Sequence, residues 1–200
     1  MSLRTFTSEA LGDLRTTSAI VPSSRYLAQA MLEPLTLARA KVVVELGPGT
    51  GALTQGLLAL MPPEATLVAF EVNPRFLEYL RQRFPDRRLI LVNRSAVTLQ
   101  AELERRGVTQ VDAAVSSLGV TFMSNGARHA VWGGLARFLT DDGVFTQYHY
   151  VHGLLPWYQK ENGRLVRFRA VELLSRYFRQ IERKVVWRNV PPAFVFICRK

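Results

Sequence analysis

Glycine and acidic residues at a regular spacing form the strongest chemical signal in the sequence. Glu45, Gly47, Gly49 and Gly51 stand at every second position, and an apolar run at 42–44 precedes them. Glycines in a turn let the backbone approach a ligand where a side chain would obstruct it. Ligands of open parallel sheets bind at the carboxyl ends of the strands. We therefore predict that this turn binds a nucleotide-like cofactor.

A second acid follows at the spacing that such a cofactor needs. Glu71 stands 20 residues beyond Gly51, at the end of the next apolar run. A carboxylate at that place can accept hydrogen bonds from both ribose hydroxyls of the cofactor. The strand, the glycine turn and the acid therefore agree on one ligand.

Two cofactors compete for this arrangement. Gly47-x-Gly49-x-x-Ala52 satisfies a relaxed dinucleotide fingerprint. Glu45-x-Gly47-x-Gly49-x-Gly51 is the form typical of S-adenosylmethionine sites, in which the acid orients the turn or reaches the amino group of the cofactor. A dehydrogenase also needs a catalytic region beyond its nucleotide fold, and 200 residues leave little room for one. We therefore favour S-adenosylmethionine over a nicotinamide, and either cofactor over a purely structural turn.

Three serines lie at the ends of two further apolar runs, which span 88–93 and 111–117. Ser95 stands where many methyltransferases have an acid that receives the adenine amino group, so we predict a cofactor contact there. A helix N-cap is an equally good interpretation of Ser95. Ser116 and Ser117 end the fourth strand, where they line the cofactor and substrate pockets, respectively, or only terminate the strand.

Short β-branched runs alternate with helical patterns from Lys41 onward, which is typical of parallel sheets with helices on both faces. We predict a doubly wound, mostly parallel α/β sheet of seven strands that ends in a C-terminal antiparallel hairpin. The strands are expected at 41–46, 66–71, 88–93, 111–117, 143–150, 185–190 and 193–198. The helices are expected at 52–60, 74–84, 97–106, 124–139 and 170–181, with a loop at 153–169.

The first 40 residues differ in character. A helix is expected at 23–40, where Pro34 should bend or divide it. We interpret 1–40 as a helical lid or membrane-facing segment and 41–200 as the cofactor-binding domain, together forming one compact domain.

Composition bounds the class of protein. A hydrophobic content of 48% excludes disorder, and the single Cys198 excludes an intramolecular disulfide framework. Three histidines leave little for a metal site, so none is expected. With no apolar run long enough to cross a bilayer and no signal peptide, we predict a cytoplasmic location.

The positive charge is concentrated in the last quarter of the chain. Residues 151–200 hold 11 Lys/Arg against 3 Asp/Glu, whereas residues 1–150 hold 15 against 13. A basic face attracts either nucleic-acid phosphates or anionic lipid headgroups, and charge alone does not choose between them.

Four motifs together resemble the bacterial phospholipid N-methyltransferases, a family with the Rossmann-like class I methyltransferase fold. They are Pro-Ser-Ser-Arg at 22–25, Val-Glu-Leu-Gly-Pro-Gly-Thr-Gly at 44–51, Val-Ser-Ser-Leu at 115–118 and Asn-Val-Pro-Pro-Ala at 189–193. The resemblance implies methyl transfer from S-adenosylmethionine to the amine of phosphatidylethanolamine-type lipids. It also implies work at an anionic membrane surface, peripheral to the inner face of the membrane. Two stretches depart from the family pattern, at 119–122 and 148–152, beside the expected substrate pocket.

An ammonium group cannot attack a methyl group, so a nearby side chain must accept its proton. Tyr26, His149 and Tyr150 are our candidates for that role. Arg25 and Arg188 are candidate clamps for the lipid phosphate, and Asn189 of the terminal motif joins them as a substrate-binding candidate. Core packing is an equally good interpretation of the tyrosines.

Other functions stay open. Ribosomal RNA adenine dimethylation would require an Asn/Asp-Leu/Ile-Pro-Phe/Tyr motif after the fourth strand, and the sequence lacks it there. A small-molecule methyltransferase and a binding module that has lost catalysis are the remaining alternatives.

Overall fold

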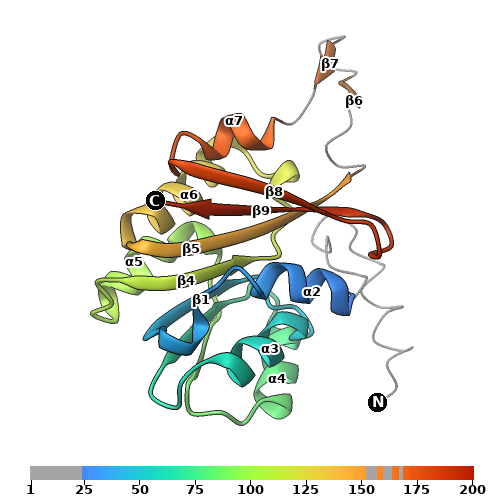
Figure 1. Ribbon diagram of the computed structural model, residues 1–200. Coiled ribbons are helices and arrows are strands. Elements are labelled where there is room, and N and C mark those ends of the chain that lie inside the picture. The colour runs from blue at the N-terminus through green and yellow to red at the C-terminus, as the bar shows by residue number, and fades with distance from the viewer. Residues whose placement is uncertain (1–23, 152–156, 160–163, 167–168) are drawn as a thin grey trace.

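A seven-stranded sheet forms the centre of the protein, and helices cover both of its faces (Figure 1). The computed structural model describes residues 24–151, 157–159, 164–166 and 169–200. The sheet has the order β3-β2-β1-β4-β5-β9-β8. Its strands are β1 (Val42–Leu46), β2 (Thr66–Phe70), β3 (Leu89–Val92), β4 (Val111–Ser116), β5 (Leu139–Tyr150), β8 (Gln180–Val186) and β9 (Ala193–Arg199).

Strands β1 to β5 run parallel, and β9 runs antiparallel to both β5 and β8. Leu46 pairs with Phe70 on one side and with Ser116 on the other, so β1, β2 and β4 end level with one another. Because β9 reverses between them, β8 runs in the same direction as β5. The predicted fold class, a doubly wound sheet closed by an antiparallel hairpin, is confirmed.

The helices lie close to where the apolar spacing predicts them. The helix that begins at Pro74 is capped by the side chain of Asn73, and both residue types are favoured at these positions. The helical elements are α2 (Arg25–Leu32), η1 (Leu37–Arg39), α3 (Ala52–Leu60), α4 (Pro74–Arg83), η2 (Ala96–Thr98), α5 (Leu99–Arg105), η3 (Val120–Phe122), α6 (Asn125–Phe138) and α7 (Ala170–Leu174).

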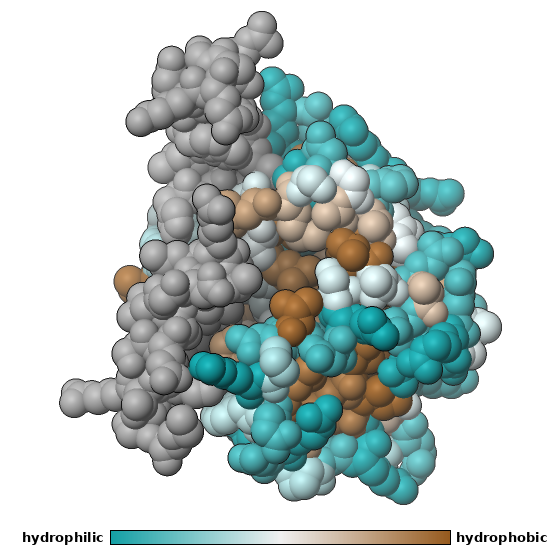
Figure 2. All heavy atoms as spheres, turned by 180° about the vertical axis from the view of Figure 1, so that it is seen from behind, coloured by the Kyte–Doolittle hydropathy of each residue, from teal (hydrophilic) through white to brown (hydrophobic). Residues whose placement is uncertain are grey.

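Successive side chains along the strands point to opposite faces of the sheet and pack into two separate hydrophobic cores. Leu27 of α2 and Leu57 of α3 pack with Val43 on one face of the sheet. Trp132 of α6 packs with Phe145 on the other face, together with the apolar sides of α5 and α7. Seen from behind the view of Figure 1, the described surface is mostly hydrophilic with apolar patches between the polar side chains (Figure 2).

Helix α2 belongs to the first core. Ser24 caps α2, which ends before Pro34, and the helix predicted at 23–40 is thereby divided into α2 and η1. Thr146 of β5 donates a hydrogen bond of 3.0 Å to the carbonyl of Met31, and Lys184 of β8 pairs with Glu33. The described part of the 1–40 segment therefore packs against the sheet, and residues 1–23 lie outside the described chain.

The C-terminal region corrects the predicted elements. The helix expected at 170–181 ends at Leu174, and residues 180–186 form β8. The apolar spacing fits a longer helix as well as the observed helix and strand, because the turn after α7 also buries Phe178. The amide of Phe178 donates a hydrogen bond to the carbonyl of Leu174, as it would in a helix. The strand expected at 185–190 stops at Val186, and a turn follows. The loop expected at 153–169 contains a small hairpin of β6 (Trp157–Gln159) and β7 (Arg164–Val166).

Within the described ranges, no helix is long and apolar enough to cross a bilayer. Cys198 is buried in β9, and burial raises the pKa of its thiol to about 12. The same ranges contain no group of three or more His, Cys, Asp or Glu side chains arranged to hold a metal ion.

Candidate active site

The glycine turn joins β1 to α3 and requires its glycines. Gly47, Gly49 and Gly51 have φ values of +74°, +54° and +82°, a region that other residues rarely adopt. A Cβ atom at Gly51 would also overlap the ring of Phe84. Backbone conformation therefore explains all three glycines, and packing adds a second reason at Gly51.

Glu71 holds the glycine turn in place. Its Oε2 accepts a hydrogen bond of 3.1 Å from the amide of Gly49, and its Oε1 accepts one of 2.9 Å from the amide of Asn73. A carboxylate has about four lone-pair sites, so acceptor capacity remains after these two bonds. The geometry fits a carboxylate that supports the turn and also receives ribose hydroxyls.

Glu45 is completely buried at the end of β1. Its Oε2 accepts a hydrogen bond of 2.8 Å from the hydroxyl of Thr54, whereas its Oε1 has no partner among the described residues. Burial raises the pKa of Glu45 to about 8; the Thr54 bond opposes the rise, and the charge of Glu71 adds to it. A buried acceptor with an open oxygen suits the cationic amino group of an S-adenosylmethionine molecule.

The three serines have structural tasks in the described chain. Ser95 is exposed and caps η2, with its hydroxyl accepting from the amide of Val97, as the alternative interpretation has it. The hydroxyl of Ser116 is buried and accepts from the amide of Leu118, and the amide of Ser117 donates to the carbonyl of Leu46. Their contacts with a ligand stay predictions.

The sequence interpretation missed two apolar side chains beside the acids. Val72 follows Glu71 and is 56% exposed, and Val97 of η2 is also exposed. The side-chain amide of Asn93 donates to the carbonyls of Glu71 and Val72, which ties the end of β3 to the end of β2. Exposed aliphatic groups at this edge suit the faces of a purine ring. Val72 stands directly after Glu71 and Val97 two positions after Ser95, and this spacing from predicted ligand contacts is the signal that could have found them.

The predicted acceptor side brings together residues that are far apart in the chain. The guanidinium groups of Arg25 and Arg188 lie 4.8 and 4.7 Å from the ring centroid of Tyr26. Arg25 also donates a hydrogen bond of 2.8 Å to the hydroxyl of Tyr26. Three predicted residues thus form one cluster at the start of α2 and the turn after β8.

Asn189 is buried and satisfies the local backbone. Its Oδ1 accepts a hydrogen bond from the amide of Ser24, and its Nδ2 donates one of 2.7 Å to the carbonyl of Pro191. These bonds fasten the turn after β8 to the start of α2. Contact with the substrate stays a prediction for Asn189.

The other two catalytic candidates lie on opposite faces of β5. Tyr150 packs with Tyr148 and the α2 core, whereas His149 packs edge-on against Phe196 on the α6 side. Burial lowers the pKa of His149 to about 4. Tyr26 and Tyr150 therefore share a face of the sheet, and His149 is separated from them.

A glycine turn between two acids, on a sheet of this strand order, defines a class I S-adenosylmethionine-dependent methyltransferase. The chain belongs to the methyltransferase domain family, whose profile matches residues 44–145.

Two kinds of relative have similar sequences. Ornithine lipid N-methyltransferase of Singulisphaera acidiphila is 28% identical over 184 residues, which cover 91% of this chain and 88% of that protein. Ribosomal RNA small subunit methyltransferase H of Aromatoleum aromaticum is 34% identical over 95 residues, which cover 48% of this chain and 30% of that protein. The first similarity extends over nearly the whole chain and the second over part of it.

Solved structures share the fold. Precorrin-6y C5,15-methyltransferase of Geobacter metallireducens is 18% identical with a TM-score of 0.65, covering 92% of this chain and 93% of that one. The glycopeptide N-methyltransferase MtfA, complexed with S-adenosyl-L-homocysteine, is 16% identical with a TM-score of 0.64, covering 88% and 89%. S-adenosylmethionine is accordingly the cofactor of this enzyme.

Proposed function

We propose that this enzyme methylates the amine of a membrane lipid, of the phosphatidylethanolamine type, at the inner face of the membrane. The observation that supports it is the Arg25–Tyr26–Arg188 cluster, because neither guanidinium pairs with an acid among the described residues. Two such cations suit a lipid phosphate. The nearly full-length similarity to an ornithine lipid N-methyltransferase supports a lipid amine and makes the ornithine headgroup the alternative acceptor.

S-adenosylmethionine, when bound, supplies a methyl group on a positively charged sulfur. The residues of this chain have to hold an uncharged amine in line with that carbon and exclude water. The nitrogen would gain a bond to the methyl carbon as the carbon–sulfur bond breaks, and the methylated ammonium group would release its proton to a neighbouring acceptor. Tyr26 and Tyr150 are the proposed acceptors, directly or through water, because they share the α2 face.

The partial similarity to a ribosomal RNA methyltransferase supports a second candidate, methylation of RNA. The basic last quarter of the chain is compatible with it.

Methyl transfer from radiolabelled S-adenosylmethionine tests both candidates. The acceptors are vesicles of phosphatidylethanolamine, vesicles of ornithine lipid and ribosomal RNA, each with Glu71→Ala at limiting cofactor concentration as the control of low activity. Label in phosphatidylethanolamine is the expected result, and label in ornithine lipid alone would correct the headgroup. Label only in RNA, or in none of the three, would overturn the lipid proposal.

A further inference from the structure

The turn between β8 and β9 exposes two large apolar side chains. Trp187 is 72% and Val190 is 81% exposed, whereas Asn189 between them is buried and hydrogen-bonded. The turn is therefore held by its own backbone contacts, and these two side chains are not needed to pack it. Tryptophan is typical of the interface between a bilayer and water.

Positive charge lies next to these apolar groups. Arg188 belongs to the same turn, and Arg25 meets it across the ring of Tyr26. The Ser24–Asn189 hydrogen bond of 3.2 Å fastens this part of α2 to the turn. We call the five residues Arg25, Tyr26, Trp187, Arg188 and Val190 the turn surface; it contains two cations and no acid.

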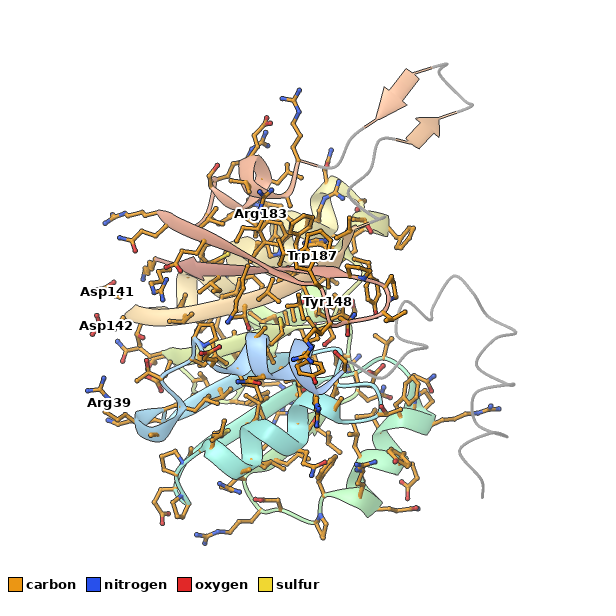
Figure 3. All side chains as sticks on the ribbon, turned by 45° about the vertical axis from the view of Figure 1, so that its right-hand side comes forward. Arg39, Asp141, Asp142, Tyr148, Arg183 and Trp187 are labelled. Carbon is orange, nitrogen blue, oxygen red and sulfur yellow. The ribbon has the colours of Figure 1, made fainter. Side chains whose placement is uncertain are left out.

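The turn surface lies at the same edge of the sheet as the cofactor site. Strands β5 and β8 run in the same direction, and the amide of Val151 after β5 donates to the carbonyl of Pro192. Strand β8 is four positions from β1 in the sheet, or about 19 Å at the usual strand spacing. Arg39, Asp141 and Asp142 mark the opposite edge, far from Trp187 (Figure 3).

We infer that the turn surface docks the enzyme on an anionic lipid bilayer, with Trp187 and Val190 entering the interface and the arginines contacting headgroup phosphates. The inference rests on the proposed function, because a bilayer at this edge would present its headgroups beside the acceptor site. Aromatic and basic groups also suit single-stranded nucleic acid. The aliphatic Val190 favours a bilayer, because it has no group with which to bind a base or a phosphate.

Vesicle binding tests the docking without the reaction. The purified enzyme is sedimented with vesicles of phosphatidylcholine, with and without phosphatidylglycerol. We expect binding to the anionic vesicles, reduced at least roughly tenfold by Trp187→Ala with Val190→Ser and about fivefold by Arg188→Gln. Leu60→Ser and Arg39→Gln are the matched controls, since both residues are exposed and lie at the opposite edge, and they should bind as the native enzyme does.

Activity then separates the docking from the proposed function. The Trp187→Ala/Val190→Ser enzyme should lose methylation of vesicles but keep methylation of a dispersed short-chain lipid amine. Undiminished vesicle binding by this variant, equal losses in the controls, or binding of RNA instead of vesicles would each overturn the inference. Vesicle binding that depends on the turn surface without label in any lipid would support the docking and refute the proposed lipid substrate.

Discussion

The two halves of the ligand-binding edge are built in opposite ways. The cofactor half is made by residues 45–71, and both of its acids are buried. Glu71 accepts hydrogen bonds from two backbone amides, and Glu45 accepts one from the hydroxyl of Thr54. The proposed acceptor half joins Arg25 and Tyr26, at the start of α2, to Arg188 in the turn after β8. Both arginines there are exposed.

This difference explains what each half can specify. In the cofactor half, a short segment makes the hydrogen bonds of its own backbone amides. Such a segment suits a cofactor that many enzymes share. An exposed cluster assembled from distant segments can change its partner without disturbing the sheet. The comparison predicts that substitutions in the cofactor half alter stability and cofactor affinity, whereas those in the acceptor half alter the choice of acceptor.

The largest effect should come from Glu45→Gln, measured as unfolding free energy against pH without cofactor. With a pKa of about 8, the folded protein keeps a proton that the unfolded chain releases above about pH 4.5. The contribution of this bound proton to stability is therefore complete below pH 4.5 and is lost as the pH rises to 8, by on the order of 5 kcal/mol. Glu45→Gln should remove this slope. The exposed Glu78→Gln serves as control, and an unchanged slope in the Glu45 variant would contradict the burial argument.

Glu71→Ala should lower the affinity for S-adenosylmethionine by about 100-fold. Hydrogen bonds to a charged group contribute about 1.5–3 kcal/mol each, and Glu71 makes two to the turns that frame the site. Calorimetric titration measures the change, with Glu78→Ala on α4 as control. A loss below about threefold would show that the glycine turn holds its shape without the acid.

Asn189→Ala should lower the unfolding free energy by about 2 kcal/mol, because it leaves the half-buried amide of Ser24 and the half-buried carbonyl of Pro191 without their partners. Denaturant unfolding measures it, and Asn125→Ala on the exposed start of α6 is the control. A raised KM with unchanged stability would instead support Asn189 as a substrate contact.

The smallest effects should separate the two faces of β5. We expect Tyr150→Phe to lower kcat by about tenfold and His149→Asn by less than about threefold. Because burial lowers the pKa of His149 to about 4, its loss should leave the rate profile between pH 6 and 9 unchanged in shape. Disappearance of a rate limb in that range with His149→Asn would make the histidine the proton acceptor.

Most of the fold follows from local patterns. The spacing of apolar residues and the capping residues predict α3 and α4 within one residue, because those signals act within one turn of helix. The pattern fails after Leu174, since Phe178 and Ile181 reach the core from a turn and a strand at the spacing that a helix would give.

The candidate site likewise has a part that local sequence patterns predict and a part that they do not. Residues Glu45 to Glu71 could be found because glycine turns and acids at strand ends have a local signature. The contact of Arg25 and Arg188 across Tyr26 depends on β9 reversing beside β5, so only the structure shows it. The opposite sides of His149 and Tyr150 follow from strand alternation, but not which of the two faces α2 covers.

Strand β9 also has a consequence for the order of assembly. It lies between β5 and β8 in the sheet, although it is the last of the described strands to be synthesised. Until β9 emerges, β8 has no neighbour and exposes two unpaired edges, which are sites of aggregation. The run Glu182, Arg183 and Lys184 places charges of both signs on β8. In the finished sheet these charges protect one edge, and during synthesis they protect the strand on both sides.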